Sequence, residues 1–422
     1  MDGVARRHVG VEPAEVDGPR VKTDHYRWVI LTLAVLTQVT GSVVAQGFYT
    51  LVPFWREAFH VSTATAALGV TALNGGQILT MMHLGRLIDR YGERVVVSST
   101  KIICGVLVLL GAAFATNFVE LLVLIVAVGA FYAAVQPGGT QAIISWFPPK
   151  ERGVATGLRQ AAVPAGTFIA ASTLPLLAAH VSWRAAFVAQ GAVSIVSGAL
   201  FWGFYREKYD ASLRVARGAE VPFRAIVGWI CSTPGFLRLT VAGIVMSAFQ
   251  FTITTYAIPY ISTELRVSIV AAASIFAIAQ FVGMPSRVLI PWLSDRIFPG
   301  RRLLSLGVCM LGGVVSLLGL TLLPSGSSWI AEVTVLGALG LTAIGWFPLF
   351  ILQVAELSHA GAASATVALS WMTCMMAMTV VPYLFGILAA DVGYGTAWAL
   401  LSLPVVASAI SLLASPRVQS VR

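Results

Sequence analysis

The segment LIDRYGER, from Leu87 to Arg94, has a second copy in LSDRIFPGRR, from Leu293 to Arg302. The aspartates of the two copies, Asp89 and Asp295, are 206 residues apart. The same offset, without a gap, pairs Pro53 with Pro259 and Ser62 with Ser268. An offset shared over such a length of chain indicates an internal duplication. Two parallel repeats with a binding site at their interface are typical of secondary transporters.

The composition around these segments is that of a membrane protein. Of 422 residues, 57% are hydrophobic and 11% are charged, with a mean hydropathy of +0.84, whereas soluble domains carry about 25% charged residues. An ordinary soluble enzyme is therefore excluded. Only helices and closed barrels can span lipid, and the apolar runs are too long for barrel strands. At about 20 residues per span, the sequence predicts an all-α integral membrane protein with twelve transmembrane helices, at residues 28–54, 64–84, 95–115, 119–147, 154–178, 184–205, 237–260, 268–292, 303–323, 329–354, 362–388 and 395–414.

The longest polar stretch divides these helices into two pseudo-symmetric six-helix bundles. The predicted parts are a tail (1–25), the first bundle (26–205), a linker (206–236), the second bundle (237–415) and a second tail (416–422). The first tail lacks the apolar core of a signal peptide, so it is interpreted as cytoplasmic. Within the linker, residues 223–230 form an amphipathic piece, interpreted as a helix that lies on the inner leaflet.

Basic residues are distributed unevenly between the two predicted sides of the membrane. With the N-terminus inside, 24 of the 27 Lys and Arg residues fall on the inner side. The outer side keeps only Arg56, Arg184 and Arg266. Because cytoplasmic loops are enriched in basic residues, both termini are predicted to be cytoplasmic, in the inner (plasma) membrane. The net charge of +9 then reflects topology and contact with membrane lipids, not binding of nucleic acid.

No pattern in the sequence indicates an enzyme, a cofactor or a metal site. The four cysteines (Cys104, Cys231, Cys309 and Cys374) are far apart and show no CxxC or Cys/His spacing. A catalytic triad, a phosphate loop and a GxSxG motif are also missing from the sequence.

The segment GRLIDRYGERVVV after the second helix resembles the signature loop of the major facilitator superfamily, G-x-L-x-D-R-x-G-x-R. The matching residues are Gly85, Leu87, Asp89, Arg90, Gly92 and Arg94. The second copy, with Asp295 and Arg296, is degraded, because Pro291 stands where the first copy has Gly85. The resemblance covers residues 26–415 and implies that this cluster latches the two halves in an outward-facing state. Asp89 is expected to accept hydrogen bonds from a neighbouring helix N-terminus. The alternative is that the cluster only anchors the topology.

A second segment, SWFPPKERGVATGLRQAAVPAG from Ser145 to Gly166, resembles the organic-anion branches of the superfamily, including monocarboxylate and oxalate permeases. Its small residues allow close helix contact. The G-P-x-x-G-G run of drug exporters is absent from the fifth helix.

Arg287 is the strongest candidate for a substrate-binding cation. It lies eight residues before Asp295, roughly 12 Å inside the end of helix 8, where anion permeases carry a substrate-gripping arginine. By resemblance it would bind the anion, and a guanidinium binds carboxylate in a bidentate manner. The alternative is an arginine that snorkels to lipid headgroups.

Departures from the family pattern limit the substrate. Met81 stands where nitrate porters of the family carry a second arginine, and Gly283 stands where proton-coupled monocarboxylate carriers have an acid. The predicted eleventh helix has no lysine, unlike that of oxalate permeases. A single fixed charge favours a substrate with one negative charge. Arg159 is a further candidate, although packing near the inner loops is the favoured interpretation. The remaining candidates for the site are uncharged. By resemblance, four glutamines lie on helices that line the cavity in the family, with interhelical hydrogen bonding as the alternative: Gln46, Gln136, Gln250 and Gln280. Four aromatic residues are candidates for the wall of the site, with packing or anchoring at the membrane interface as the alternative: Tyr132, Tyr256, Trp346 and Trp371.

The sequence is therefore interpreted as a secondary active or facilitative transporter of a small organic monoanion, such as a monocarboxylate, that works by alternating access. Its expected partners are the substrate, with or without a coupling ion, and membrane lipids, and a monomer is expected. Two alternatives stay open. An exporter of lipophilic or drug-like compounds would also use a weakly charged, aromatic cavity. A transporter-like membrane sensor is disfavoured because no soluble output domain is recognisable.

Overall fold

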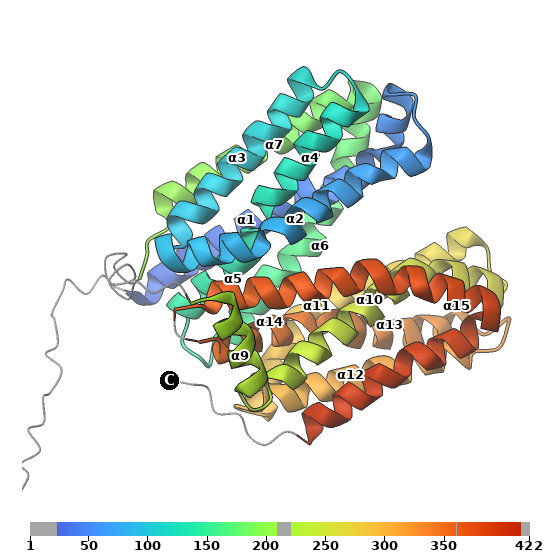
Figure 1. The fold of residues 1–422 in the computed structure, drawn as a ribbon. Coiled ribbons are helices and arrows are strands. Elements are labelled where there is room, and N and C mark those ends of the chain that lie inside the picture. Colours follow the sequence, from blue (N-terminus) through green and yellow to red (C-terminus); the bar gives the residue numbers. More distant parts are fainter. Residues whose placement is uncertain (1–22, 209–220, 360, 415–422) are drawn as a thin grey trace, which may run out of the picture.

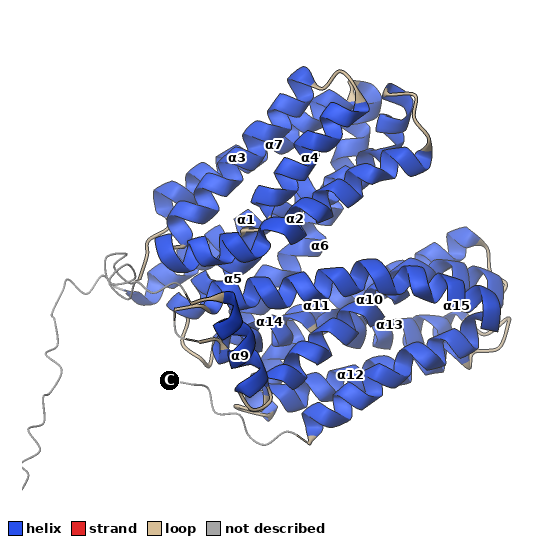
Figure 2. Ribbon diagram, viewed as in Figure 1, coloured by secondary structure: helices blue, strands red, loops and turns tan. Residues whose placement is uncertain are grey.

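The computed structural model describes residues 23–208, 221–359 and 361–414, and in these ranges all regular structure is helical (Figure 2). The first group of helices comprises α1 (Thr23–Ala58), α2 (Thr63–Tyr91), α3 (Glu93–Phe114), α4 (Phe118–Tyr132), α5 (Val135–Trp146), α6 (Arg152–His180) and α7 (Trp183–Phe204). After α9 (Phe223–Ser232), the second group comprises α10 (Phe236–Glu264), α11 (Ile269–Ile297), α12 (Arg302–Thr321), α13 (Trp329–Gly345), α14 (Phe347–Leu357) and α15 (Ala363–Leu413).

These helices confirm the predicted twelve-span, all-α membrane fold. Ten helices in the described residues are long and apolar enough to cross a membrane, with α4–α5 and α13–α14 each counted as one. The helix α2 provides another span. The 51-residue α15 holds two spans, because Gly393 interrupts its helical backbone with φ 79° and ψ 160°.

Three predicted loop boundaries are wrong. The signature segment is mostly helical: α2 continues to Tyr91, and Gly92 alone separates it from α3. Gly92 has φ 87°, a conformation that other residues adopt only with strain. The eighth span likewise continues to Ile297, beyond the predicted end at residue 292. Between the last two spans, a kink at Gly393 replaces the expected loop.

The two groups of helices form two bodies, the N-terminal half (α1–α7) and the C-terminal half (α10–α15). They approach each other at the end that carries α9 and diverge toward the opposite end (Figure 1). We call these the linker end and the far end. The connections α1–α2 and α10–α11 lie at the far end.

Small residues allow close packing inside each half. A Cβ atom at Gly76 of α2 would lie 2.1 Å from the carbonyl oxygen of Val126 in α4. In the C-terminal half, a Cβ at Gly340 of α13 would lie 2.1 Å from the carbonyl oxygen of Ala279 in α11. Such backbone approach is the usual basis of helix association in membranes, and it occurs at corresponding places in the two repeats.

The amphipathic piece of the linker lies in the helix α9 (Phe223–Ser232). It buries Ile226 and Ile230 against the C-terminal half. The indole of Trp229 donates a hydrogen bond of 2.9 Å to the carbonyl oxygen of Leu357, at the end of α14. Phe223 and Val227 stay exposed, so contact of this face with the inner leaflet stays a prediction. The rest of the predicted linker, residues 209–220, lies outside the described residues.

Candidate functional site

Arg287 lies where the two halves meet. From α11 of the C-terminal half, its Nη1 atom donates a hydrogen bond of 2.9 Å to the backbone oxygen of Gln160 in α6 of the N-terminal half. Its Nε atom is buried without a hydrogen-bond partner. A guanidinium held between two protein bodies does not match the snorkelling alternative, in which it would extend to the headgroups.

Arg159 is fully buried within the N-terminal half, with 0% of its surface exposed. It donates hydrogen bonds to Gln38 Oε1 (2.5 Å), to the backbone oxygen of Gln136 (3.2 Å) and to Thr140 Oγ1 (3.0 Å). These contacts join α6 to α1 and α5, which agrees with the packing interpretation. No acidic side chain of the described residues forms an ion pair with it.

Arg287 and Arg159 belong to one chain of polar contacts. The backbone oxygen of Gln160 accepts the hydrogen bond from Arg287. The side-chain Nε2 atom of Gln160 donates to Gln136 Oε1 at 3.3 Å. The Nε2 atom of Gln136 is buried without a partner, and the backbone oxygen of the same residue accepts from Arg159. We call Arg287, Gln160, Gln136, Arg159 and Gln38 the polar chain. The sequence analysis did not single out Gln160, although its position directly after Arg159 was a usable signal.

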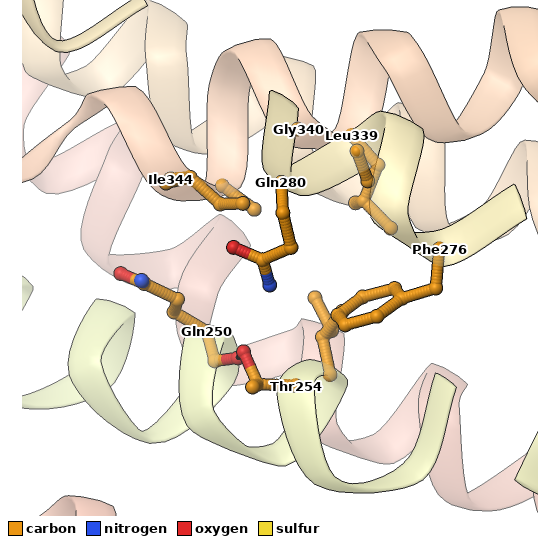
Figure 3. A pocket seen from close by; sticks show the side chains of 10 residues that line it. Gln250, Thr254, Phe276, Gln280, Leu339, Gly340 and Ile344 are labelled. Atoms are coloured by element: carbon orange, nitrogen blue, oxygen red, sulfur yellow. Dashed lines mark hydrogen bonds between the residues drawn. The ribbon is translucent and has the colours of Figure 1, made fainter. Parts of the chain in front are cut away.

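Two of the predicted glutamines line a small pocket inside the C-terminal half. Gln250 and Gln280 face each other there, with Thr254 and Phe276 beside them (Figure 3). The cavity volume is about 10 Å³, which is at the lower limit for one water molecule. In its present form the pocket therefore does not hold an organic substrate.

The predicted aromatic residues have different environments. Trp346 is buried (1% exposed) and donates a 2.7 Å hydrogen bond to Gln250 Oε1, so in this structure it is part of the packed interior. Tyr256 packs on Phe385, with ring centroids 5.1 Å apart.

The other predicted residues lie at the boundary between the halves or inside the N-terminal half. Trp371 of α15 contacts the ring of Phe347 and packs against a buried cluster that includes Met81 of α2. The ring of Tyr132 lies beside Gly41 of α1, and Gln46 is a partly buried residue of the same helix.

Asp89 joins the two halves at the linker end. Its two carboxylate oxygens accept hydrogen bonds of 2.9 Å from the backbone amides of Ser364 and Ala365, in the first turn of α15. The expected hydrogen bonds to a neighbouring helix N-terminus are thus present, and the positive end of the helix dipole favours a carboxylate there. Gly85 permits this approach, since a Cβ atom at that position would lie 2.8 Å from the Cα of Ala365.

The second copy of the signature makes the corresponding contact in the opposite direction. Asp295 lies at the first turn of α6, where a Cβ at Gly153 would be 2.2 Å from its Oδ2 atom. Arg302 pairs with Asp295 at 2.9 Å and also with Glu356. Arg152 of the N-terminal half reaches Glu356 at 3.5 Å. We call Asp295, Arg302, Glu356 and Arg152 the Glu356 cluster.

The other signature residues contact their own half. Arg94 donates to the backbone oxygen of Trp202 at 2.8 Å, which ties α3 to the end of α7. Arg90 and Arg296 are exposed, and each lies over an aromatic ring of its own helix, Tyr91 and Trp292. Asp89 and the Glu356 cluster form contacts between the halves, and their role as a latch stays a prediction. No motif in the sequence pointed to a contact between Glu356 and Arg152 or Arg302.

Replacing Gly157 with valine is expected to open the linker end. A Cβ at this position of α6 would lie 2.4 Å from the backbone oxygen of Arg287 in α11, so the halves have to separate. Spin labels on the native Cys231 and on a Phe204→Cys substitution, both exposed, report this distance. Gly203→Val is the control, because a Cβ there meets nothing within 4 Å. Equal distance distributions in both variants would show that the approach at Gly157 does not limit opening.

A known protein family matches most of this chain. A family model described as Major Facilitator Superfamily matches residues 31–382. The chain belongs to the Major Facilitator Superfamily. This membership places it with transporters and not with enzymes, and it confirms the resemblance seen in the signature segment.

Known transporters resemble the chain to different extents. It is 28% identical over 184 residues to a galacturonate transporter of Dickeya chrysanthemi, covering 44% of this chain and 53% of that protein. It is 28% identical over 200 residues to a probable sulfoacetate transporter of Cupriavidus necator, covering 46% and 45%. The chain thus spans about half the length of these curated relatives. The fucose:proton symporter of Escherichia coli has the same fold, with a TM-score of 0.73 at 14% identity over 92% of this chain and 98% of that one.

Proposed function

We propose that this superfamily member transports a small organic monoanion across the plasma membrane by alternating access. The observation that carries the proposal is the guanidinium of Arg287, held at the interface of the two halves with one buried, unpartnered nitrogen. A carboxylate placed there would receive charge-assisted hydrogen bonds, which are about twice as strong as neutral ones.

The relatives support an organic acid as the substrate. One is named for galacturonate and one for sulfoacetate, and both compounds are small organic anions. Galacturonate carries one carboxylate, so it is a suitable first probe for a monocarboxylate site.

The contacts at the linker end support alternating access. Asp89 and the Glu356 cluster hold the halves together there, while the helices diverge toward the far end (Figure 1). With the linker end cytoplasmic, this arrangement is an outward-facing state. Breaking both sets of contacts would let the predicted bundles, 26–205 and 237–415, rock about the polar chain.

A thermal-shift panel tests the substrate class. The purified protein is heated with galacturonate, glucuronate, sulfoacetate, benzoate or a lipophilic cation, since a ligand stabilises the folded protein that it binds. At a ligand concentration of 100 Kd the stabilisation is about 2.7 kcal/mol. We expect a shift with a monocarboxylate. A shift with the lipophilic cation alone would contradict the proposal and favour the exporter.

The proposed topology predicts the labelling of one native thiol. Cys231 of α9 is exposed, whereas Cys104, Cys309 and Cys374 are buried. A membrane-impermeant maleimide should therefore label Cys231 only when it is applied to the cytoplasmic face. A cysteine in place of Arg266, which is exposed at the far end, should react from the opposite face. Reversed labelling would overturn the cytoplasmic assignment of the linker.

A further inference from the structure

Lys101 is a buried cation in the N-terminal half. The sequence analysis counted it among the basic residues of the inner segments. In the structure it is the ninth residue of α3, about 12 Å along the helix from its start, and only 2% of its surface is exposed. Burying an ammonium is costly unless its charge is compensated, so the position needs an explanation beyond topology.

The surroundings of Lys101 connect it to the polar chain. A Cβ atom at Gly41 of α1 would lie 3.8 Å from the Lys101 ammonium and 3.0 Å from the ring of Tyr132. Gln38, which accepts a hydrogen bond from Arg159, lies one turn before Gly41 on the same helix. Lys101 and Arg159 are thus two buried cations that approach neighbouring turns of α1.

The helices around Lys101 provide no compensating carboxylate beside it. Among the described residues, no acid forms an ion pair with Lys101 or Arg159. On α3 itself, Cys104 donates to the carbonyl oxygen of Val128 at 3.4 Å, and Glu93 lies two turns away at the linker end, where it accepts from Ser145 at 3.4 Å. The neighbouring helices add no nearby charge. The helices α1 and α7 present glycine and serine, and α5 has no ionisable residue. The ionisable residues of α2 lie at its linker end, and the acid of α4, Glu120, is exposed in the first turn of that helix.

We propose that Lys101 is the proton-carrying residue of the transport cycle, protonated when the anion is bound and neutral when the site is empty. The proposal rests on the proposed function. An arginine stays charged in proteins, whereas a lysine amine can release its proton when it is buried. A bound anion offsets part of the fixed positive charge of Arg287 and Arg159, and this favours the ammonium form of Lys101. An empty site leaves these charges uncompensated and favours the neutral amine.

The proton balance of the cycle follows directly. At the far end, the lone pair of the Lys101 amine takes a proton from water as the anion enters. At the linker end, the anion leaves and the ammonium returns the proton to water. One proton therefore moves with each monoanion, and the net transport is electroneutral. No intramembrane carboxylate is required.

The test compares accumulation with exchange in proteoliposomes, using labelled D-galacturonate. Wild-type protein and the control Lys208→Gln, which removes an exposed lysine, should accumulate the probe under an inward proton gradient and alkalinise the outer medium. Lys101→Gln and Lys101→Arg cannot release and regain the proton. We expect them to exchange external for internal galacturonate within about threefold of the wild-type rate, but to lose accumulation and alkalinisation.

The outcomes separate the two proposals. Gradient-driven accumulation by either Lys101 variant would overturn the role of Lys101. Loss of both exchange and accumulation in both variants would assign Lys101 a structural role and overturn it as well. Failure of the wild-type protein to exchange galacturonate, with no thermal shift by any anion of the panel, would overturn the proposed function itself.

Discussion

Replacement of Arg287 by alanine is expected to abolish galacturonate uptake while the protein still inserts and purifies normally. Removing one partner of a desolvated charge pair costs about 2–5 kcal/mol, which corresponds to a loss of affinity of roughly thirtyfold or more. The substitution also removes the contact from Arg287 to Gln160, but the two halves keep their separate cores. Uptake and binding are measured in matched proteoliposomes and by thermal shift.

A lysine variant of Arg287 and a control at Arg301 show which property of Arg287 matters. Arg287→Lys keeps the charge but loses the planar, bidentate donor, so affinity should weaken without vanishing. Arg301→Ala is the control, because that arginine is exposed just after α11. Wild-type transport by Arg287→Ala would remove the basis of the anion hypothesis and give the exporter precedence. Smaller losses are expected for Gln136 and Gln160 variants, since a neutral hydrogen bond contributes about 1 kcal/mol net.

Removal of the acidic contacts at the linker end should shift the protein toward a state open at that end. Asp89→Asn loses hydrogen bonds to a charged acceptor, which contribute about 1.5–3 kcal/mol each. Glu356→Gln leaves Arg152 and Arg302 without their shared acid, and breaking a buried ion pair in this way costs about 3–5 kcal/mol. Each 1.4 kcal/mol changes the population ratio about tenfold, so both variants should show a second, longer distance between labels at Cys231 and Phe204→Cys.

A matched acid far from these contacts serves as the control. Glu57 is an exposed acid near the far end whose ion pair with Arg56 is solvent-accessible, and such pairs contribute about 0–1 kcal/mol. Glu57→Gln should leave the distance distribution unchanged. If Asp89→Asn and Glu356→Gln also leave it unchanged, these residues only anchor the topology.

The contact of Asp89 with a helix N-terminus was predictable because its sequence context is local. The signature segment repeats after 206 residues and places a carboxylate at the end of a span, and such a group is favoured near a helix N-terminus. The Glu356 cluster was not predictable in the same way. Glu356 and Arg152 are 204 residues apart, and no repeat or spacing connects them. Only the approach of α6 to α11 and α14 brings them together.

The sequence by itself determined the spans, the duplication and the family, because hydropathy and signature motifs are local properties of the chain. Only the tertiary structure decided which intramembrane side chains meet. Lipid is as apolar as a helix interface, so hydrophobic periodicity does not separate the buried face from the lipid-facing one. Phe276 and Phe281 of α11 are 7% and 76% exposed, yet the sequence does not distinguish them. For the same reason Trp346 was expected at the site but lies in the packed interior, and Lys101, counted with the inner basic residues, lies beside the polar chain.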